Sequence, residues 1–343
     1  MPIEPTHALK KRIKTLENVI VVEDGQIIEQ RLDETMQLIN ITTKPSNHVA
    51  LCKETSKMVQ LNESTRNSFL SLDIPSNKTF KKPLHLFFIA NKKAVVHKTA
   101  IHVAENTQFK LFESVTGYGD QTINYVSDTH LEADAQLTYT TLSSGDKSVA
   151  SAIVRNAALK ARAVITYTNG VFTNGTTNQE NHVLLNGAAA EGIAKTIALT
   201  SDTQETLIKT TVEHLAPKSK GLIEHYGVAN DASTLIFEGV GKIHKNMRQS
   251  EARQSNKGVV IGAQARLDAN PLLLIDEHDV EAGHGAAIGR IDEDQLYYLM
   301  SRGLNLREAE KLIINGYVAP LQKIIESETI KEHVNTLLSQ KIQ

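Results

Sequence analysis

The chain has very little cysteine. Cys52 is the only one among its 343 residues, so no disulfide can form within the chain and no cysteine-rich zinc site is possible. The same count excludes any metal–sulfur cluster held by four thiolates of this chain alone. A group of that kind would need most of its ligands from another molecule.

An excess of one charge and long apolar runs are also missing. Lys and Arg total 37 against 39 Asp and Glu, which leaves a net charge of −2 and gives no reason to expect nucleic acid or an anionic membrane as the main partner. No stretch of 18 apolar residues occurs, and the first thirty residues contain no apolar core of a signal peptide. We therefore expect a soluble, cytoplasmic protein, and the length suggests about two domains.

The common catalytic motifs are absent as well. The chain contains no G-x-x-x-x-G-K-[ST], no G-x-S-x-G and no H-E-x-x-H sequence. His97 and His102 are five residues apart in one expected strand, so their side chains would face opposite sides and make poor co-ligands. We expect no catalytic centre.

Proline is scarce in the middle of the chain, where only Pro217 lies between Pro83 and Pro271. A stretch nearly free of proline permits continuous sheet. This region contains short runs rich in Val, Ile, Thr and Leu, bounded by Asn, Asp or Gly, at 94–103, 161–168, 181–185, 194–200, 206–215, 233–240, 257–262 and 272–276. The runs predict many short strands, and no helical pattern separates them as a doubly wound α/β sheet would require.

Small residues recur in the turn clusters near residues 155, 185, 229 and 262, at spacings that are not constant. Such residues suit the corners of a parallel β-helix, where stacked turns approach closely. A two-sheet sandwich also uses many short strands and remains the alternative at this point.

The flanks differ from this core. We expect a short mixed N-terminal region at 1–80, with a hairpin that turns at Asp24-Gly25, then the β core at 81–291 and a helical region at 292–343. Three capping boxes mark the helical region: Asp292 with Gln295, Asn305 with Glu308, and Thr329 with Glu332.

One histidine stands out because small residues surround it, in the segment Ala282-Gly283-His284-Gly285-Ala286-Ala287. These neighbours leave the His284 ring accessible and let another chain approach the backbone. Histidine can ligate iron, zinc or copper, although one is not enough to hold an ion alone. The alternative is a structural histidine that closes the last β turn.

Residues 241–317 resemble the C-terminal core of the SufB/SufD family, and within it the SufD branch. The resemblance rests on the motifs GKIH at 241–244, S-x-A-x-Q-x-N at 250–256, A-R-x-D-A-N-P at 265–271, Gly-His-Gly-Ala at 283–286 and QLYYLMSRG at 295–303. It extends more weakly upstream through 81–90 and 130–142.

The resemblance implies a right-handed parallel β-helix (β-solenoid) followed by C-terminal helices. It also implies a non-catalytic scaffold subunit for iron–sulfur cluster assembly, which pairs with a SufB-like subunit or forms a homodimer in isolation. A β-helix polysaccharide-active enzyme or a partner-free binding module is the alternative. The family's N-terminal helical region is longer than the segment that precedes the hairpin here.

Cluster assembly in the family is placed at the SufB–SufD interface, where a histidine that matches His284 is implicated as a ligand or sulfur-path residue. Many relatives carry Cys at the position of Ala282. We expect transient iron or a transient cluster at this interface and no cofactor stably bound by the isolated chain. The C-terminal helices are expected to close the open end of the β-helix and to dock a SufC-like ABC ATPase, with partner-binding residues Leu306, Ile313, Tyr317, Ile330, Val334 and Leu337.

Overall fold

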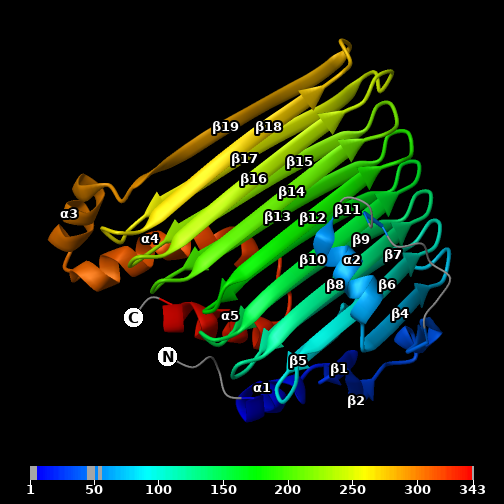
Figure 1. Cartoon of the computed structure of the whole chain (residues 1–343), viewed down its shortest axis with the longest axis horizontal. Helices are drawn as coiled ribbons and strands as arrows, with labels where there is room; N and C mark the ends of the chain where they lie inside the picture. The colour runs from blue at the N-terminus through cyan, green and yellow to red at the C-terminus, as the bar shows by residue number, and fades with distance from the viewer. Residues whose placement is uncertain (1–5, 45–50, 53–55, 342–343) are drawn as a thin grey trace.

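The chain forms a stack of two β-sheets with helices outside it (Figure 1). The computed structural model describes residues 6–44, 51–52 and 56–341. Successive core strands lie in opposite sheets, so each strand pairs with the strand two places away in the sequence. One sheet, here sheet A, has the order β19-β17-β15-β13-β11-β9-β7-β5-β1-β2, and the other, sheet B, has the order β18-β16-β14-β12-β10-β8-β6-β4-β3.

The elements have the following bounds. The N-terminal part contains α1 (Thr6–Ile13), β1 (Val19–Glu23), β2 (Gln26–Arg31), the 3₁₀ turn η1 (Met36–Leu38), β3 (Asn40–Thr42), α2 (Lys57–Thr65) and β4 (Ser68–Ile74). The core continues with β5 (Leu84–Ala90), β6 (Val95–Val103), β7 (Gln108–Gly117), β8 (Thr122–Leu131), β9 (Gln136–Gly145), β10 (Ala150–Leu159), β11 (Val164–Thr173), β12 (Thr177–Leu185), β13 (Glu191–Thr200), β14 (Glu205–His214), β15 (Lys220–Ala229), β16 (Thr234–Ile243), β17 (Ser250–Val260), β18 (Arg266–Ile275) and β19 (Val280–Arg290). The chain ends in α3 (Glu293–Ser301), α4 (Leu306–Gln322) and α5 (Glu328–Lys341).

The strands from β4 to β19 pair in parallel, which makes the core a parallel β-solenoid of about 8 turns. The predicted fold is confirmed, and the sandwich alternative is wrong. The repeat length varies: Ser151 aligns with Thr177, 26 residues later, whereas Thr234 aligns with Arg266, 32 residues later. This variation explains why the sequence shows no fixed period.

The corners of the solenoid stack closely. At one edge, Asn106, Asp134 and Arg162 each adopt a left-handed backbone, with φ of 54°, 62° and 57°. Each donates its backbone N–H to a carbonyl in the next turn of the stack, so the corners form a hydrogen-bonded column. A Cβ on Gly187 would lie 2.0 Å from the backbone nitrogen of Ala161, which is why small residues recur at these positions.

The space between the sheets is only partly apolar. Glu113 and Arg155 are both fully buried and lie 2.8 Å apart, and Tyr125 and Tyr139 donate their hydroxyls to the same carboxylate. Burial raises the pKa of both tyrosines well above 10, and the negative charge of Glu113 adds to the effect. Inward polar residues of this kind hide the apolar alternation of β7 to β10, which the sequence did not reveal as strands.

The N-terminal elements extend the sheets. The hairpin of β1 and β2 is antiparallel with its turn at Asp24-Gly25, as predicted, and β1 pairs with β5. Because β4 already pairs with β6, the sheets begin before the expected boundary at residue 81. Helix α2 lies on the outer face of sheet B, where Asn62 donates to the carbonyl of His97 at 2.9 Å.

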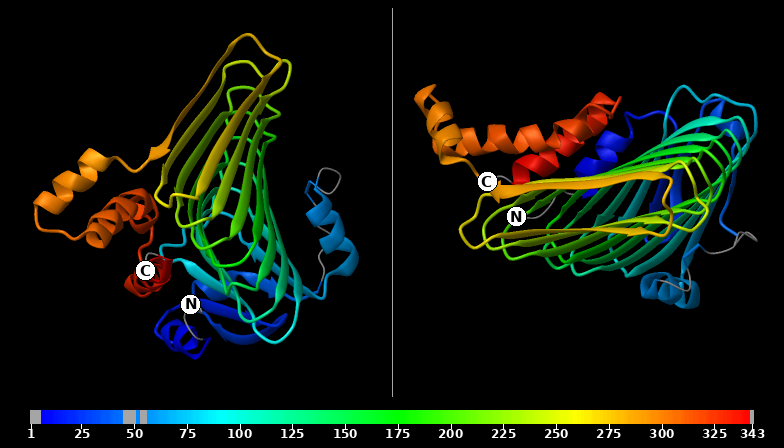
Figure 2. Two further views of the ribbon diagram at one scale, coloured as in Figure 1. Left: turned by 60° about the vertical axis from the view of Figure 1, so that its left-hand side comes forward. Right: turned by 90° about the horizontal axis from the view of Figure 1, so that it is seen from above.

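The C-terminal helices lie on the opposite side of the solenoid from α2 (Figure 2). The first of them, α3, begins at Glu293, three residues after the end of β19 at Arg290. Asp292 caps α3, and Asn305 forms a full capping box with Glu308. The third predicted cap is misplaced, because Thr329 lies inside α5 and the side chain of Ser327 accepts from the N–H of Ile330 at 3.4 Å.

Candidate functional site at the open end of the solenoid

The last turn of the solenoid is uncovered. Strand β19 has only β17 as a neighbour, and β18 has only β16. Each strand therefore has a free edge of unpaired backbone N–H and C=O groups within the part of the chain that the structure describes. An exposed edge ten or more residues long is a template for pairing with another chain.

The C-terminal helices do not close this end, contrary to the prediction. Helix α4 packs on the outer face of sheet A, against β11, β13 and β15. Figure 1 shows β18 and β19 extending beyond the helices at the top of the stack. The helices therefore cover a side of the solenoid and leave its mouth open.

His284 lies in β19 and faces the mouth. It aligns with Gln254 of β17, which is 5% exposed and points between the sheets. Side chains in aligned positions of neighbouring strands share a face, so His284 belongs to the same inward row. The ring is exposed because no further turn among the described residues covers it.

The flanking glycines open the space around this histidine. A Cβ at Gly283, Gly285 or Gly289 would meet no atom within 4 Å. These glycines face outward, so the outer surface of β19 is nearly free of side chains. His284 is thus presented on a bare strand, where another backbone can approach from either face.

The buried amide of Gln254 links β17 to β18 in the opposite sheet. Gln254 crosses the interior and donates its Nε2 to the carbonyl of Leu272 in β18 at 2.7 Å. A Cβ on Gly239 would lie 2.6 Å from Gln254 Oε1, so that glycine makes room for the amide. The motif at 250–256 contains Gln254, but nothing in the sequence indicated this hydrogen bond between the two sheets.

Apolar side chains are exposed beside the free edge of β18. Leu272 is 51% exposed and Leu274 is 50% exposed, and they align with the outward-facing Val240 and Lys242 of β16. The sequence predicted a short strand at 272–276 and did not indicate that these leucines are exposed. Two leucines on an outer face next to an unpaired edge are typical of a surface that a partner covers.

A groove separates the C-terminal helices from the end of sheet A. Its volume is about 790 Å³, with Lys257, Val259, Ala287 and Gly289 on the strand side. The helix side includes Leu299 of α3 and Ile313 and Tyr317 of α4, among others. Two of the predicted partner-binding residues, Ile313 and Tyr317, therefore line an open groove.

The other predicted partner-binding residues divide into two groups. Leu306 is 48% exposed at the start of α4, as a docking residue should be. Ile330, Val334 and Leu337 are buried within the chain, against sheet A and its helices, so the expectation that they are free for docking is wrong for this conformation.

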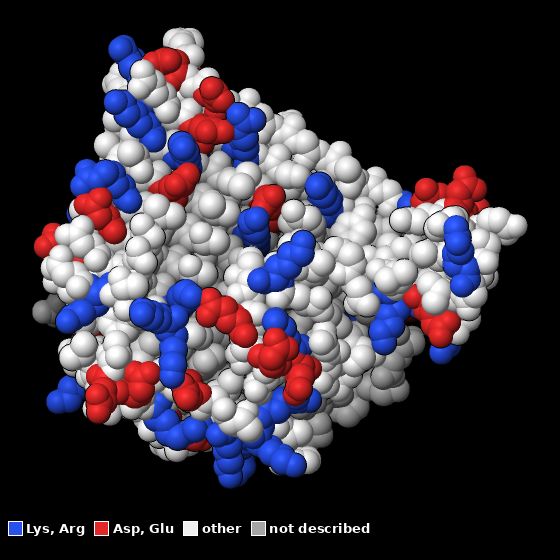
Figure 3. Space-filling view, turned by 180° about the vertical axis from the view of Figure 1, so that it is seen from behind, with Lys and Arg blue, Asp and Glu red and all other residues white. Residues whose placement is uncertain are grey.

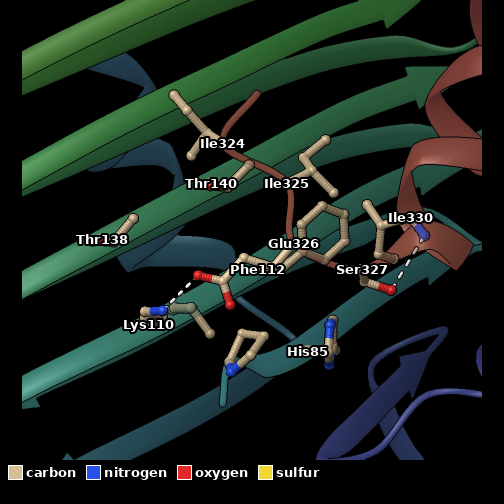
Figure 4. Close-up of a pocket in the computed structure, with 12 residues that line it drawn as sticks. His85, Lys110, Phe112, Thr138, Thr140, Ile324, Ile325, Glu326, Ser327 and Ile330 are labelled. Atoms are coloured by element: carbon tan, nitrogen blue, oxygen red, sulfur yellow. Dashed lines mark hydrogen bonds and ion pairs between the residues drawn. The ribbon is translucent and has the colours of Figure 1, made fainter. Parts of the chain in front are cut away.

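A second cavity lies at the linker between α4 and α5 (Figure 4). Its volume is about 50 Å³, with Phe112, Ile325 and Ile330 among its lining residues, and the ion pair between Lys110 and Glu326 spans 2.5 Å beside it. The only histidine in the lining, His85, has a pKa lowered by burial. A space of this size holds a few water molecules, so we assign it no function.

The charges of the molecule show no dominant sign. On the face shown in Figure 3, basic and acidic side chains alternate. Within the described residues, no group of three or more His, Cys, Asp and Glu side chains could hold a metal ion, and no helix among them is both long and apolar enough to span a membrane. His97 and His102 face opposite sides of β6, as predicted.

Comparison with known proteins identifies the family. The sequence pattern of the SufBD core domain of the SUF system for FeS cluster assembly matches residues 87–317. The iron–sulfur cluster assembly protein SufD of Bacillus subtilis is 32% identical over 294 residues, which cover 84% of this chain and 67% of that protein. SufD of Escherichia coli is 23% identical over 299 residues, which cover 83% of this chain and 69% of that protein.

A further relative is much longer than this chain. It is an iron–sulfur cluster assembly SufBD family protein of Mycobacterium tuberculosis, 27% identical over 209 residues, which cover 61% of this chain and 25% of that protein. The match to the core pattern runs from β5 through the open end of the solenoid to Tyr317 in α4, so it includes both His284 and the groove. The chain therefore belongs to the SufBD core family of iron–sulfur cluster assembly proteins and is most like its SufD members.

Proposed function

We propose that the chain is a non-catalytic scaffold subunit that adds its two sheets to those of a SufB-like partner and presents His284 at the junction. The observation that carries this proposal is the open end, where two parallel strands with free edges flank an exposed histidine on the inward row. Strand addition satisfies the backbone groups of both edges at once. The exposed Leu272 and Leu274 would then be covered by the outer surface of the partner.

The iron–sulfur cluster is the cargo of this junction. His284 can supply one nitrogen ligand, and the chain can supply no thiolate there because Cys52 is its only cysteine and lies on the side of α2. The remaining ligands must come from the partner, since such clusters are usually held by several thiolates. Ala282, two residues earlier on the same inward row, adds space and no ligand.

The second contact is an ABC-type ATPase of the SufC kind at the groove between β19 and the helices α3 and α4. Tyr297 is 76% exposed, and Met300 and Leu312 are also exposed large apolar residues on these two helices. Exposed side chains of this type beside a groove are suited to a partner helix. Leu306, Ile313 and Tyr317 complete this docking surface.

Substitutions at two neighbouring alanines can distinguish the two proposed contacts. Ala286 lies on the inward row of β19, and Ala287 lies on the outward row and lines the groove. Both are exposed, so a lysine at either position stays in solvent and the chain can fold. Ala286→Lys should block strand addition at the mouth and leave ATPase binding intact, whereas Ala287→Lys should do the reverse.

The measurement is co-purification from the native cytoplasm, followed by titration of each purified partner against each variant. A loss of at least tenfold in affinity is expected for the matched contact only. If Ala286→Lys still pairs with the SufB-like subunit as the unchanged chain does, sheet addition at this end is not the mode of pairing. Equal loss in both variants would indicate unfolding, which circular dichroism of the purified chains detects.

The cargo is tested separately. After anaerobic reconstitution with iron and sulfide, the isolated chain should show no stable iron–sulfur absorption, and the complex with its SufB-like partner should show it. A stoichiometric, stable cluster on the isolated chain would contradict the shared site.

A further inference from the structure

Helix α5 is held against the solenoid along one face. Its buried apolar residues Ile330, Val334, Leu337 and Leu338 belong to the same cluster as Leu9 and Ile13 of α1 and Phe172 at the end of β11. The outer side of the helix adds polar contacts, with Arg12 donating to Glu332 at 3.0 Å and to Thr336 at 3.1 Å. The helix therefore runs as a strap between α1 and sheet A.

The last turn of the strap ends in a buried lysine. Lys341 is 5% exposed and donates its ammonium group to the backbone carbonyl of Thr173 and to Oε1 of Gln204. The same two acceptors are tied to each other, because Gln204 also donates its Nε2 to Thr173 at 3.1 Å. Thr173 ends β11 and Gln204 precedes β14, so Lys341 joins the end of α5 to two successive corners of the solenoid.

Among the described residues, no opposite charge pairs directly with this amine. Within the described part of the chain, no carboxylate lies within 4.0 Å of its Nζ. Asp202 and Asp231 act on it from the neighbouring corners, and Lys147 opposes them while it pairs with Asp202 at 2.9 Å. On α5 itself, His333 is the other buried titratable group. Burial lowers the pKa of Lys341 to about 7.

We propose that α5 is a releasable strap and that Lys341 is its latch, so that protonation of this amine loosens the strap and uncovers the apolar face of Ile330, Val334 and Leu337. The geometry supports this role because Lys341 is the last residue of α5 and, among the described residues, its amine donates only to two neutral acceptors at the corners. Taking a charged amine into such a place costs free energy, whereas a neutral amine can donate there at little cost. The inference goes beyond the proposed function and does not depend on which partner binds.

The sign of the effect follows from proton linkage. In the released helix Lys341 has its ordinary pKa near 10.5, and in the docked helix the pKa is about 7. Between these values the released form binds more protons, so docking strengthens by about tenfold per pH unit as the pH rises above 7. Below pH 7 the amine is charged in both forms, and docking no longer changes with pH.

Hydrogen exchange of the full chain tests the latch. Peptides that cover 328–341 are followed from pH 6 to pH 9, with each rate corrected for the intrinsic pH dependence of exchange. Protection of α5 should be constant below pH 7 and rise by about tenfold per unit above it. In Lys341→Met, which keeps the length of the side chain and removes the amine, protection should not depend on pH.

Lys331→Met is the matched control. Lys331 lies on the same helix but pairs at the surface with Glu328 at 2.6 Å, so this variant should follow the unchanged chain. A flat profile in the unchanged chain overturns the proposal, as does a rise that persists in Lys341→Met. If Lys341→Met fails to dock α5 at any pH, the profile of the unchanged chain still decides, because it needs no substitution.

Discussion

The two ends of the solenoid are built differently. At the N-terminal end, the short antiparallel strands β2 and β3 lie at the edges, and Arg31 of β2 donates to the carbonyls of Ile13 and Lys14 beside α1. At the C-terminal end, the edges are the long parallel strands β18 and β19, and no further strand among the described residues pairs with them. A reversed or shortened strand cannot continue a parallel stack, whereas a long parallel strand can.

The two ends therefore differ in whether their edge strands can pair with a further strand. At the N-terminal end, the edge strand β2 is hydrogen-bonded to the segment around α1 of the same chain. Contacts of this kind prevent an edge strand from pairing with another molecule. The open end has long parallel edge strands, exposed leucines at 272 and 274 on its outer surface, and His284 at its mouth. Among the described residues, the same solenoid thus has short antiparallel edge strands at one end and long parallel edge strands at the other.

Acid should act more strongly on the half of the solenoid near the open end. Burial lowers the pKa of His214 and His225 to about 4 and that of His97 to about 3. These histidines stay neutral in the fold, so their contribution to stability is complete above pH 6.5. It falls by about 1.4 kcal/mol per pH unit for each histidine as the pH drops toward 4.

Two of these three strongly shifted histidines lie in β14 and β15, toward the open end, and one lies in β6. Burial also lowers the pKa of His85 in β5, but less strongly. In hydrogen exchange between pH 6.5 and pH 4.5, β14 to β16 should therefore lose protection ahead of β5 to β8. His225→Gln should reduce the acid dependence of the unfolding midpoint by the share of one histidine. Equal loss of protection in both halves would show that these buried histidines do not set the order.

Within the half near the N-terminal end, the buried pair of Arg155 and Glu113 should matter most among single side chains. Arg155→Met leaves a buried carboxylate with only its tyrosine donors, which should cost about 3–5 kcal/mol in the free energy of unfolding. The control is Arg162→Met, which breaks the exposed pair with Asp134 and should cost less than about 1 kcal/mol. Urea unfolding midpoints measure both, and similar losses in the two variants would contradict the role of the buried pair.

This buried pair also explains what the sequence could reveal of the fold. The fold class could be predicted from the sparse proline and the many short β-rich runs. Both features determine whether the backbone can form a continuous sheet. The strands β7 to β10 were not apparent, since inward positions there hold Glu113, Thr141, Arg155 and similar polar residues that break the alternation. A fixed repeat could not be seen because turn lengths differ from one turn to the next.

The site was predictable in part for a similar reason. The small residues around His284 indicated an accessible ring, and the structure places that ring on the inward row at the mouth. The apolar stripes of α4 and α5 predicted that each helix packs against another surface. A stripe alone does not indicate whether that surface belongs to the same chain or to a partner. Ile330 and Val334 face inward, whereas Leu306 remains exposed.

The exposed leucines of β18 should affect pairing and not stability. Leu272→Ser with Leu274→Ser removes apolar surface that water already reaches, so the free energy of unfolding should change by no more than about 0.5 kcal/mol per site. Affinity for the SufB-like partner should fall by at least tenfold. The control is Ile28→Ser in β2, a residue that is 50% exposed at the N-terminal end and should change neither quantity.

Thermal midpoints and a pairing titration separate the two effects. If the leucine variant pairs with unchanged affinity, the partner does not cover the outer face of β18. If Ile28→Ser weakens pairing as much as the leucine variant does, the N-terminal end also takes part in an interface, and the comparison between the ends fails.

His284→Ala should have the smallest effect on the fold and a specific effect on the cargo. The ring is exposed at the mouth and its neighbours are glycines, so its loss should change the free energy of unfolding by no more than about 0.5 kcal/mol. Pairing should persist because strand addition uses the backbone of β19, while cluster formation on the paired complex should fall.

The matched control is His278→Ala, which removes an exposed histidine in the turn before β19 and should leave cluster formation unchanged. Reconstitution of each complex under anaerobic conditions, followed by its absorption, gives the rate of cluster formation. A wild-type rate in His284→Ala would mean that the histidine only closes the last turn, and the ligands of the cargo would then have to come from the partner alone.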